Sequence, residues 1–352
     1  MSSEVLSQLL HLLALSTNGI DRKCRDCILE GVSFPNMNKR YDDADTAHHA
    51  TFTWILEDDA VDEEYYDTVP DPVKEDKEKR LPTERDIHGS IRHKFRSWLA
   101  RGKGVYQIYA KPGAGKSTMM KFICNSDEAK KLLRLWSGDR TLITARFFFW
   151  KQESRMQRSL DGMIRSLLHA ILSQAPELIE GVFPVQWRSL KSAPWHAILV
   201  PEISNADARI AFENLLSHAN TKVFSAYSVC VFLDGLDEFE GKKGSAELIN
   251  FIQNMALLSD HIKICVSSRL MNSLAPFDVA YPQQRMCLNT LTEADIRRVV
   301  RDTLNDHPRF REMRLEGNSA CDDLIAAVVG KAEGVFLWVT LILKILCQGL
   351  TD

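Results

Sequence analysis

The sequence predicts an α/β fold with a parallel sheet, followed by a smaller helical domain. Between residues 91 and 290, short segments rich in β-branched and aromatic residues alternate with amphipathic helical segments. After residue 290 the helical pattern continues without another strand-like segment. The chain has 352 residues, 45% of them hydrophobic, which is enough for one large and one small domain. Alternating strands and helices, followed by helices alone, are typical of a parallel sheet that is covered by helices and followed by a helical domain.

Five segments are expected to form the strands of this sheet. They are residues 105–110 (VYQIYA), 141–150 (TLITARFFFW), 228–234 (SVCVFLD), 262–270 (IKICVSSRL) and 285–289 (RMCLN).

Helices are expected between these strands. The segment IRHKFRSWLARGKG predicts a helix that ends at Gly102 or Gly104. Apolar residues recur at helical spacing from Leu160 to Leu172, and this helix must stop before Pro176. A further helix is expected over residues 206–218.

The C-terminal region, residues 291–352, is expected to form a helical lid domain. Thr292 and Asp295 have the spacing of a capping box at a helix N-terminus, with Asp in place of Glu. This helix ends before Pro308, and residues 322–349 are expected to be helical with a break near Gly334.

The N-terminal part contains two further regions. Residues 1–56 are expected to be a helical flanking region that begins with an amphipathic helix over residues 4–15, and residues 57–86 an acidic, flexible insertion. Between Glu57 and Glu78 there are eleven acidic residues and two lysines, a composition that opposes compaction. The alternative is an acidic surface that binds a partner or covers a basic site on the same chain. The predicted sheet domain then spans residues 87–290.

The bulk composition argues against several classes of protein. The net charge of −3 gives no general attraction to nucleic acid. The N-terminus lacks the basic segment of a signal peptide, and the longest apolar run, 334–343, is too short to span a bilayer. The eight cysteines are scattered, as expected for a reduced protein. The expected location is cytoplasmic.

Residues 110–118 (AKPGAGKST) form the strongest functional motif, because they lie between a predicted strand and a predicted helix. Gly113 and Gly115 allow backbone N–H groups to approach a phosphate closely. Lys116 supplies positive charge and Ser117 a hydroxyl group for Mg²⁺. The predicted nucleotide-binding residues are Lys111, Pro112, Gly113, Ala114, Gly115, Lys116, Ser117 and Thr118.

Ala110 stands where such loops usually begin with glycine. Phosphate contacts come mainly from the later N–H groups. Alanine is therefore expected to be tolerated, provided that the φ angle at this position is negative.

Charged residues follow two of the other strands. Asp234 ends an apolar strand, where a carboxylate can anchor Mg²⁺ beside a phosphate-binding loop. Asp237 and Glu238 follow directly, and three carboxylates so close together favour a nearby cation. Arg269 follows the next strand and could reach a γ-phosphate.

The order of these motifs resembles the NACHT branch of the STAND signalling ATPases. The flanking segments AHHATFTWIL, LNTLTEADIRRVV and KAEGVFLWVTLIL are similar to those of fungal NOD-like receptors with a nephrocystin-like N-terminal domain. The resemblance covers roughly residues 28–350, apart from the acidic stretch.

This resemblance implies a P-loop NTPase with strand order 5-1-4-3-2, sandwiched by helices and followed by the lid. It implies ATP and ADP with Mg²⁺ as cofactors, slow hydrolysis, and an exchange of ADP for ATP that leads to homo-oligomerisation. Lys116 and Ser117 match the phosphate and magnesium groups, and Asp234 the magnesium-anchoring aspartate. One of Asp237 and Glu238 orients the attacking water, with Glu238 preferred. Arg269 corresponds to the first sensor.

The sequence departs from the family pattern in ways that leave alternatives open. Relatives carry Gly-x-Pro in the lid where this chain has Gly334-Val335-Phe336, and effector and sensor domains are expected to be missing. A non-hydrolysing nucleotide-binding scaffold, or a truncated remnant of a larger receptor, is the main alternative. An enzyme that transfers phosphate to a small molecule is a weaker one. The choice of ATP over GTP rests on the resemblance.

Overall fold

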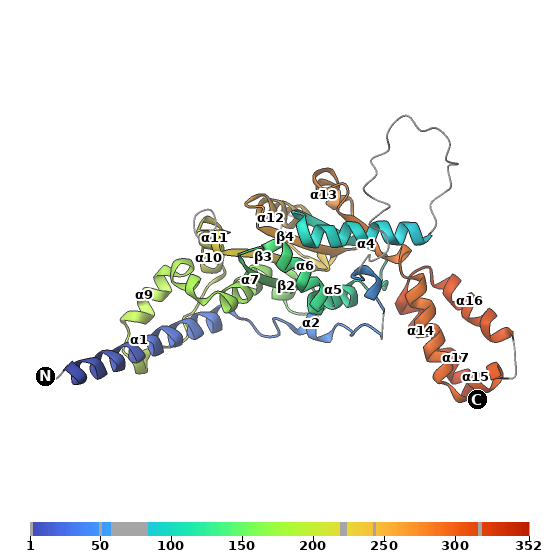
Figure 1. The fold of residues 1–352 in the computed structure, drawn as a ribbon, viewed down its shortest axis with the longest axis horizontal. Helices are drawn as coiled ribbons and strands as arrows, with labels where there is room; N and C mark the ends of the chain where they lie inside the picture. The colour runs from blue at the N-terminus through green and yellow to red at the C-terminus, as the bar shows by residue number, and fades with distance from the viewer. Residues whose placement is uncertain are drawn as a thin grey trace. The chain divides into compact units, whose positions relative to one another are not determined.

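The computed structural model describes residues 3–48, 51–57, 84–218, 224–241, 244–315 and 319–351. Within these segments the chain forms a five-stranded parallel sheet with many helices (Figure 1). The predicted α/β class is therefore confirmed. Nearly all of the predicted acidic insertion, residues 58–83, lies outside the described residues.

The five strands fall within the segments expected from the sequence, to within one residue. They are β1 (Gly104–Tyr109), β2 (Thr141–Phe148), β3 (Tyr227–Asp234), β4 (Ile262–Ser268) and β5 (Arg285–Cys287). Their order across the sheet is β2-β3-β4-β1-β5, which reads 5-1-4-3-2 from the opposite edge. In a parallel sheet the carboxyl ends of all strands meet at one edge. The residues that follow β1, β3 and β4 therefore gather there.

The chain divides into two compact units. The first comprises Met1–Asp42, Asp139–Leu233 and Glu238–Ile264. The second comprises Asp43–Gly138, Asp234–Asp237 and Cys265–Asp352.

The first unit contains strands β2 and β3 and most of the helices that precede the lid. Helix α7 (Leu160–Gln174) is largely apolar and buried. Its one buried arginine, Arg165, donates to the backbone oxygens of Gly31 and Val32, each at 3.1 Å, and so ties the end of α1 to α7. The other helices are α1 (Ser3–Val32), α2 (Lys39–Asp43, which ends at the unit boundary), α8 (Ile179–Val182), α9 (Pro184–Ser192), α10 (Asn205–His218), α11 (Phe224–Ala226) and α12 (Ser245–Leu257).

The second unit contains β1 and β5 and the helices that flank them. Helix α4 (Glu84–Arg101) packs against β1 through Phe95, Trp98 and Tyr106, whose rings contact one another. It ends one residue before Gly102, close to the expected position. The remaining helices of this part are α5 (Lys116–Asn125), α6 (Asp127–Ser137) and α13 (Ala275–Ala280).

Four helices at the C-terminal end of the second unit lie alongside one another (Figure 1), and we call them the lid after the predicted domain that they occupy. They are α14 (Glu293–Asp306), α15 (Pro308–Leu315), α16 (Ala320–Ala332) and α17 (Phe336–Thr351). They share an apolar core that includes Val300, Val328 and Val339. The predicted break near Gly334 is confirmed, because Gly334 has φ 78° and its backbone packs tightly on Asn289.

The predicted capping box at the start of α14 is wrong. Thr292 is the N-cap residue, but its side chain makes no capping hydrogen bond. Its hydroxyl group lies 3.4 Å from the backbone oxygen of Gly334, and the Asp295 carboxylate binds groups in residues 52–54 instead. A tertiary contact has replaced the local one that the spacing suggested.

Two further expectations can be compared with the structure. Within the described segments, no helix is long and apolar enough to cross a membrane. All eight cysteines lie in described segments, and none of them forms a disulfide.

Candidate functional site

A glycine-rich loop, residues 110–115, joins β1 to α5. Gly113 (φ 72°) and Gly115 (φ 86°) both have left-handed backbone conformations, which residues with side chains adopt only at a cost. Pro112 and Ala114 lie within the loop, and Thr118 lies in the first turn of α5. The two glycines thus allow the chain to reverse directly in front of a helix N-terminus.

Ala110 fits its position at the end of β1. Its side chain is buried, and its N–H group donates to the backbone oxygen of Ser268 at 3.3 Å. Among the described residues, the non-glycine positions with positive φ are Asn36, Phe52 and Glu333. The φ angle of Ala110 is therefore negative, as the sequence analysis required.

We expect Ala110→Gly to leave ligand binding by the loop unchanged and to lower the free energy of unfolding by about 0.5–1 kcal/mol. Glycine gains backbone freedom in the unfolded chain and buries no methyl group here. Urea unfolding monitored by circular dichroism measures this change. An increase in stability would contradict this explanation of the alanine.

Lys116 lies over the loop that precedes it. Its Nζ atom is 3.2 Å from the backbone oxygens of both Ala110 and Lys111. An ammonium group held there is close to the loop N–H groups, so it can exchange these carbonyl contacts for phosphate oxygens.

Ser117 and Asp234, the two residues predicted to hold Mg²⁺, contact each other. The Ser117 hydroxyl group donates to Asp234 Oδ2 at 2.6 Å, and the Ser267 hydroxyl group donates to the other oxygen, Oδ1. The N–H group of Gly235 in turn donates to Ser267 Oγ at 3.3 Å. Asp234 is 1% exposed. A hydroxyl group and a fixed carboxylate beside a phosphate-binding loop are the oxygen ligands that Mg²⁺ prefers.

Asp237 and Arg269 bind each other in the second unit. Asp237 lies in the short helix η6 (Leu236–Glu238) and accepts the backbone N–H of Arg269 at 2.9 Å. The Arg269 Nε atom is 3.0 Å from the other carboxylate oxygen. Asp237 thus determines the position of the predicted sensor arginine.

Glu238 is the neighbour of Asp237 in the sequence but belongs to the first unit. There its Oε2 atom accepts the backbone N–H of Lys151 at 2.9 Å. The two members of the acidic pair therefore have different partners.

The lid contacts the glycine-rich loop within the second unit. The N–H group of Leu337, in the first turn of α17, donates to the backbone oxygen of Gly113 at 3.0 Å. Lys111 forms a 2.7 Å ion pair with Glu333, and its N–H group donates to Asn289 Oδ1 at 3.2 Å. Sequence reasoning missed Asn289 and Glu333, and only the nearby break at Gly334 indicated that this part of the lid is unusual.

Two aromatic rings pack against Gly115 of the loop. A Cβ atom at position 115 would lie 3.2 Å from ring atoms of both Phe52 and Phe336. The two rings contact each other edge to face, with centroids 5.6 Å apart. Phe52 has φ 64°, a strained conformation for a bulky residue that costs about 1–3 kcal/mol. It precedes the short helix η1 (Thr53–Ile55).

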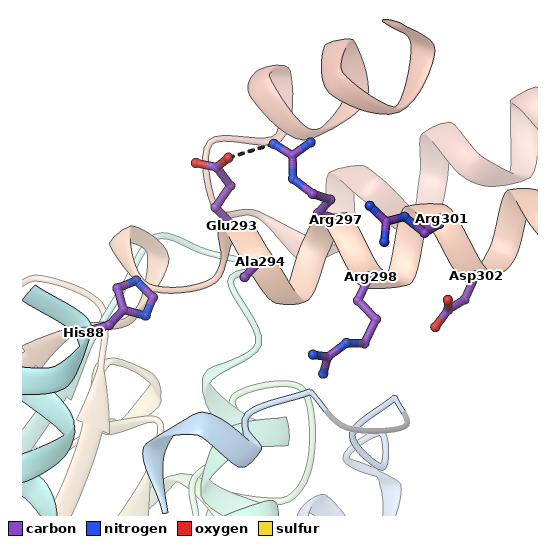
Figure 2. Close-up of a pocket in the computed structure, with 7 residues that line it drawn as sticks. All are labelled: His88, Glu293, Ala294, Arg297, Arg298, Arg301 and Asp302. Carbon is purple, nitrogen blue, oxygen red and sulfur yellow. Dashed lines mark hydrogen bonds and ion pairs between the residues drawn. The ribbon is translucent and has the colours of Figure 1, made fainter. Parts of the chain in front are cut away.

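A separate pocket of about 650 Å³ lies beside α14, and none of its described lining residues belongs to the loop (Figure 2). Its charged lining includes Arg297, Arg298 and Arg301, with His88 from α4. Figure 2 shows the side chains of Arg297 and Arg298 pointing to opposite sides of the helix. These guanidinium groups do not converge on one anion, so the loop is the better candidate for a functional site.

The fold and this site define an α/β protein in which a glycine-rich loop, a lysine, a serine and a strand-end aspartate meet. The sequence matches the family model Nephrocystin 3, N-terminal, over residues 91–269, about half of the chain. The chain belongs to this family. The matched segment contains Lys111–Thr118, Asp234, Asp237, Glu238 and Arg269, and it excludes the lid and Phe52. A search of curated proteins found no significant match.

Proposed function

We propose that the chain binds ATP and ADP with Mg²⁺ at the glycine-rich loop and acts as a nucleotide-dependent switch. The observation that carries this proposal is the 2.6 Å contact between Ser117 and the buried Asp234, beside Lys116. A hydroxyl group at the start of a helix and a strand-end carboxylate, at this distance and after such a loop, suit a magnesium–phosphate group. The family match is consistent with a nucleotide-binding region related to NACHT domains.

Each residue has a definite part in this proposal. The loop N–H groups bind phosphate oxygens, and Lys116 neutralises charge on the β- and γ-phosphates. Ser117 and Asp234 hold Mg²⁺, directly or through water, and the ion supplies charge stabilisation to the phosphates when it is bound. Glu238 accepts a proton from the attacking water, and Asp237 keeps Arg269 in reach of the γ-phosphate.

The lid contacts support a switch rather than a metabolic enzyme. A phosphate in the loop competes for Lys111, whose ammonium group is paired with Glu333 of the lid. It also binds beside Gly113, whose backbone oxygen accepts the N–H group of Leu337 in the lid. Binding at the loop therefore alters contacts with the lid, as in a signalling ATPase of the STAND type. Oligomerisation in the ATP state is part of the same proposal, as is a fungal NOD-like receptor origin.

A non-hydrolysing scaffold is the second candidate. The observation in its favour is that Asp237 and Arg269 bind each other, which satisfies the charges of both groups. A protein in which this pair remains closed would bind nucleotide without placing an arginine on the γ-phosphate.

A single-turnover assay with excess protein and labelled ATP separates these functions. Slow phosphate release supports the switch. Saturable binding without release supports the scaffold, and turnover that needs an added acceptor indicates a phosphotransferase. A folded protein that binds no nucleotide would refute all three.

A further inference from the structure

Asp295 is a buried carboxylate with an unusual set of partners. Its side chain is on α14 of the lid and is 2% exposed. Its Oδ2 atom accepts the backbone N–H of Phe52 at 3.1 Å and the indole N–H of Trp54 at 2.9 Å. We call residues 51–57 the N-terminal strap. One carboxylate oxygen of the lid thus binds two donors in this strap.

The strap reaches the glycine-rich loop through Phe52. The ring of Phe52 lies against Gly115 and contacts Phe336, which begins α17. Phe52 has a left-handed backbone in this position, and its N–H group is the one that Asp295 binds. The hydrogen bond therefore offsets the strain that places the ring on the loop.

We propose that Asp295 is a positioning residue, which holds Phe52 against Gly115 and so fixes the glycine-rich loop in the form that binds nucleotide. This inference rests on the proposed nucleotide binding. A loop whose N–H groups already point at one place loses less entropy when a phosphate binds. Without the acceptor on α14, the strap relaxes toward an unstrained backbone and Phe52 leaves the loop.

The electrostatic environment of Asp295 is consistent with a role in geometry rather than in charge. Burial raises the pKa of this carboxyl group above its ordinary value. The hydrogen bonds from Phe52 and Trp54 lower the pKa, as do the charges of Arg298 and His88, but burial has the larger effect. Both donors bind the same oxygen, so a neutral amide that presents one carbonyl oxygen can replace the carboxylate.

The test compares Asp295→Leu with Asp295→Asn. Asp295→Leu removes the acceptor, and we expect ATP to bind about tenfold more weakly, which corresponds to about 1.4 kcal/mol. Asp295→Asn keeps the acceptor, and its affinity should stay within about threefold of the original protein. Asp302→Leu is the matched control, because it removes a carboxylate two turns further along α14 and should leave the affinity unchanged. Isothermal titration calorimetry with ATP and Mg²⁺ gives the three affinities.

A second measurement needs no nucleotide. Amide hydrogen exchange of residues 111–118 in the nucleotide-free protein should be faster in Asp295→Leu and unchanged in Asp295→Asn. The exchange measurement therefore tests the positioning role even if the protein binds no ATP. Absence of ATP binding would refute only the proposed function. If Asp295→Leu does not fold, Phe52→Leu replaces it, with the same faster exchange expected because the ring no longer covers Gly115.

The pH dependence of folding gives an independent check. A carboxyl group with a raised folded-state pKa adds stability below its unfolded pKa, and this stability is lost as pH rises through the folded pKa. Asp295→Asn should therefore raise the urea midpoint at pH 7 and flatten its dependence on pH.

Two results of the hydrogen-exchange experiment would overturn the inference. One is an equal loss of loop protection in Asp295→Asn and Asp295→Leu, and the other is unchanged protection in a folded Asp295→Leu protein.

Discussion

Lys116→Ala is expected to weaken ATP binding by about a hundredfold while the fold survives. The Nζ atom lies 3.2 Å from two backbone oxygens of the loop, and the side chain is not part of the buried core. A hydrogen bond to a charged group contributes about 1.5–3 kcal/mol. Loss of the ammonium group that binds the phosphates should therefore weaken ATP binding by about a hundredfold. Calorimetric titration with ATP and Mg²⁺ measures it.

Lys131→Ala is the matched control for this change. Lys131 is an exposed lysine on α6, and its ammonium group pairs with Glu128 at 3.4 Å on the same helix. The control removes the same charge from the protein without altering the loop, so ATP affinity should be that of the original chain. An Lys116→Ala protein with a native circular dichroism spectrum and unchanged affinity would show that the loop is not the nucleotide site.

Glu238→Gln is expected to slow hydrolysis by about 10²–10⁴-fold and to leave ATP binding intact. Glutamine keeps the carbonyl oxygen that can accept the Lys151 N–H group, so the local structure is preserved. It removes the group that takes a proton from water, and general-base catalysis typically contributes a factor of this size. Single-turnover hydrolysis and equilibrium binding, measured on the same preparation, separate the two effects.

Asp237→Asn provides the comparison within the acidic pair. Its carboxylate holds Arg269 through both the backbone N–H and Nε, so we expect a smaller loss of rate from a displaced arginine. If Asp237→Asn abolishes hydrolysis and Glu238→Gln does not, the two roles are reversed. If neither change affects the rate, the scaffold function is supported.

The parts of the fold that were predictable depend on local patterns. Each strand carries a run of apolar, β-branched or aromatic residues, and the glycine-rich loop carries its own glycines and is followed directly by Lys116. The contact between Ser117 and Asp234 was also predictable, because both residues stand at the carboxyl edge of a parallel sheet.

The contacts between the lid and the loop were not predictable in this way. Asn289 and Glu333 bind Lys111 from positions more than 170 residues away, and nothing near them in the sequence indicates this. Asp295 is the clearest example of a local pattern that predicts the wrong contact. Its spacing from Thr292 matches a capping box. The carboxylate instead binds Phe52 and Trp54, partners that only the tertiary structure brings within reach.

The proposed function requires that the loop hold a magnesium–nucleotide complex through Ser117 and Asp234. The most direct test is a titration of ATP into the protein, with Mg²⁺ and then with EDTA, for the original chain and for Ser117→Ala. We predict saturable binding to one site, about tenfold tighter with Mg²⁺ in the original chain and independent of Mg²⁺ in the variant. Absence of saturable binding to the folded original chain, or an undiminished Mg²⁺ effect in Ser117→Ala, would contradict the account.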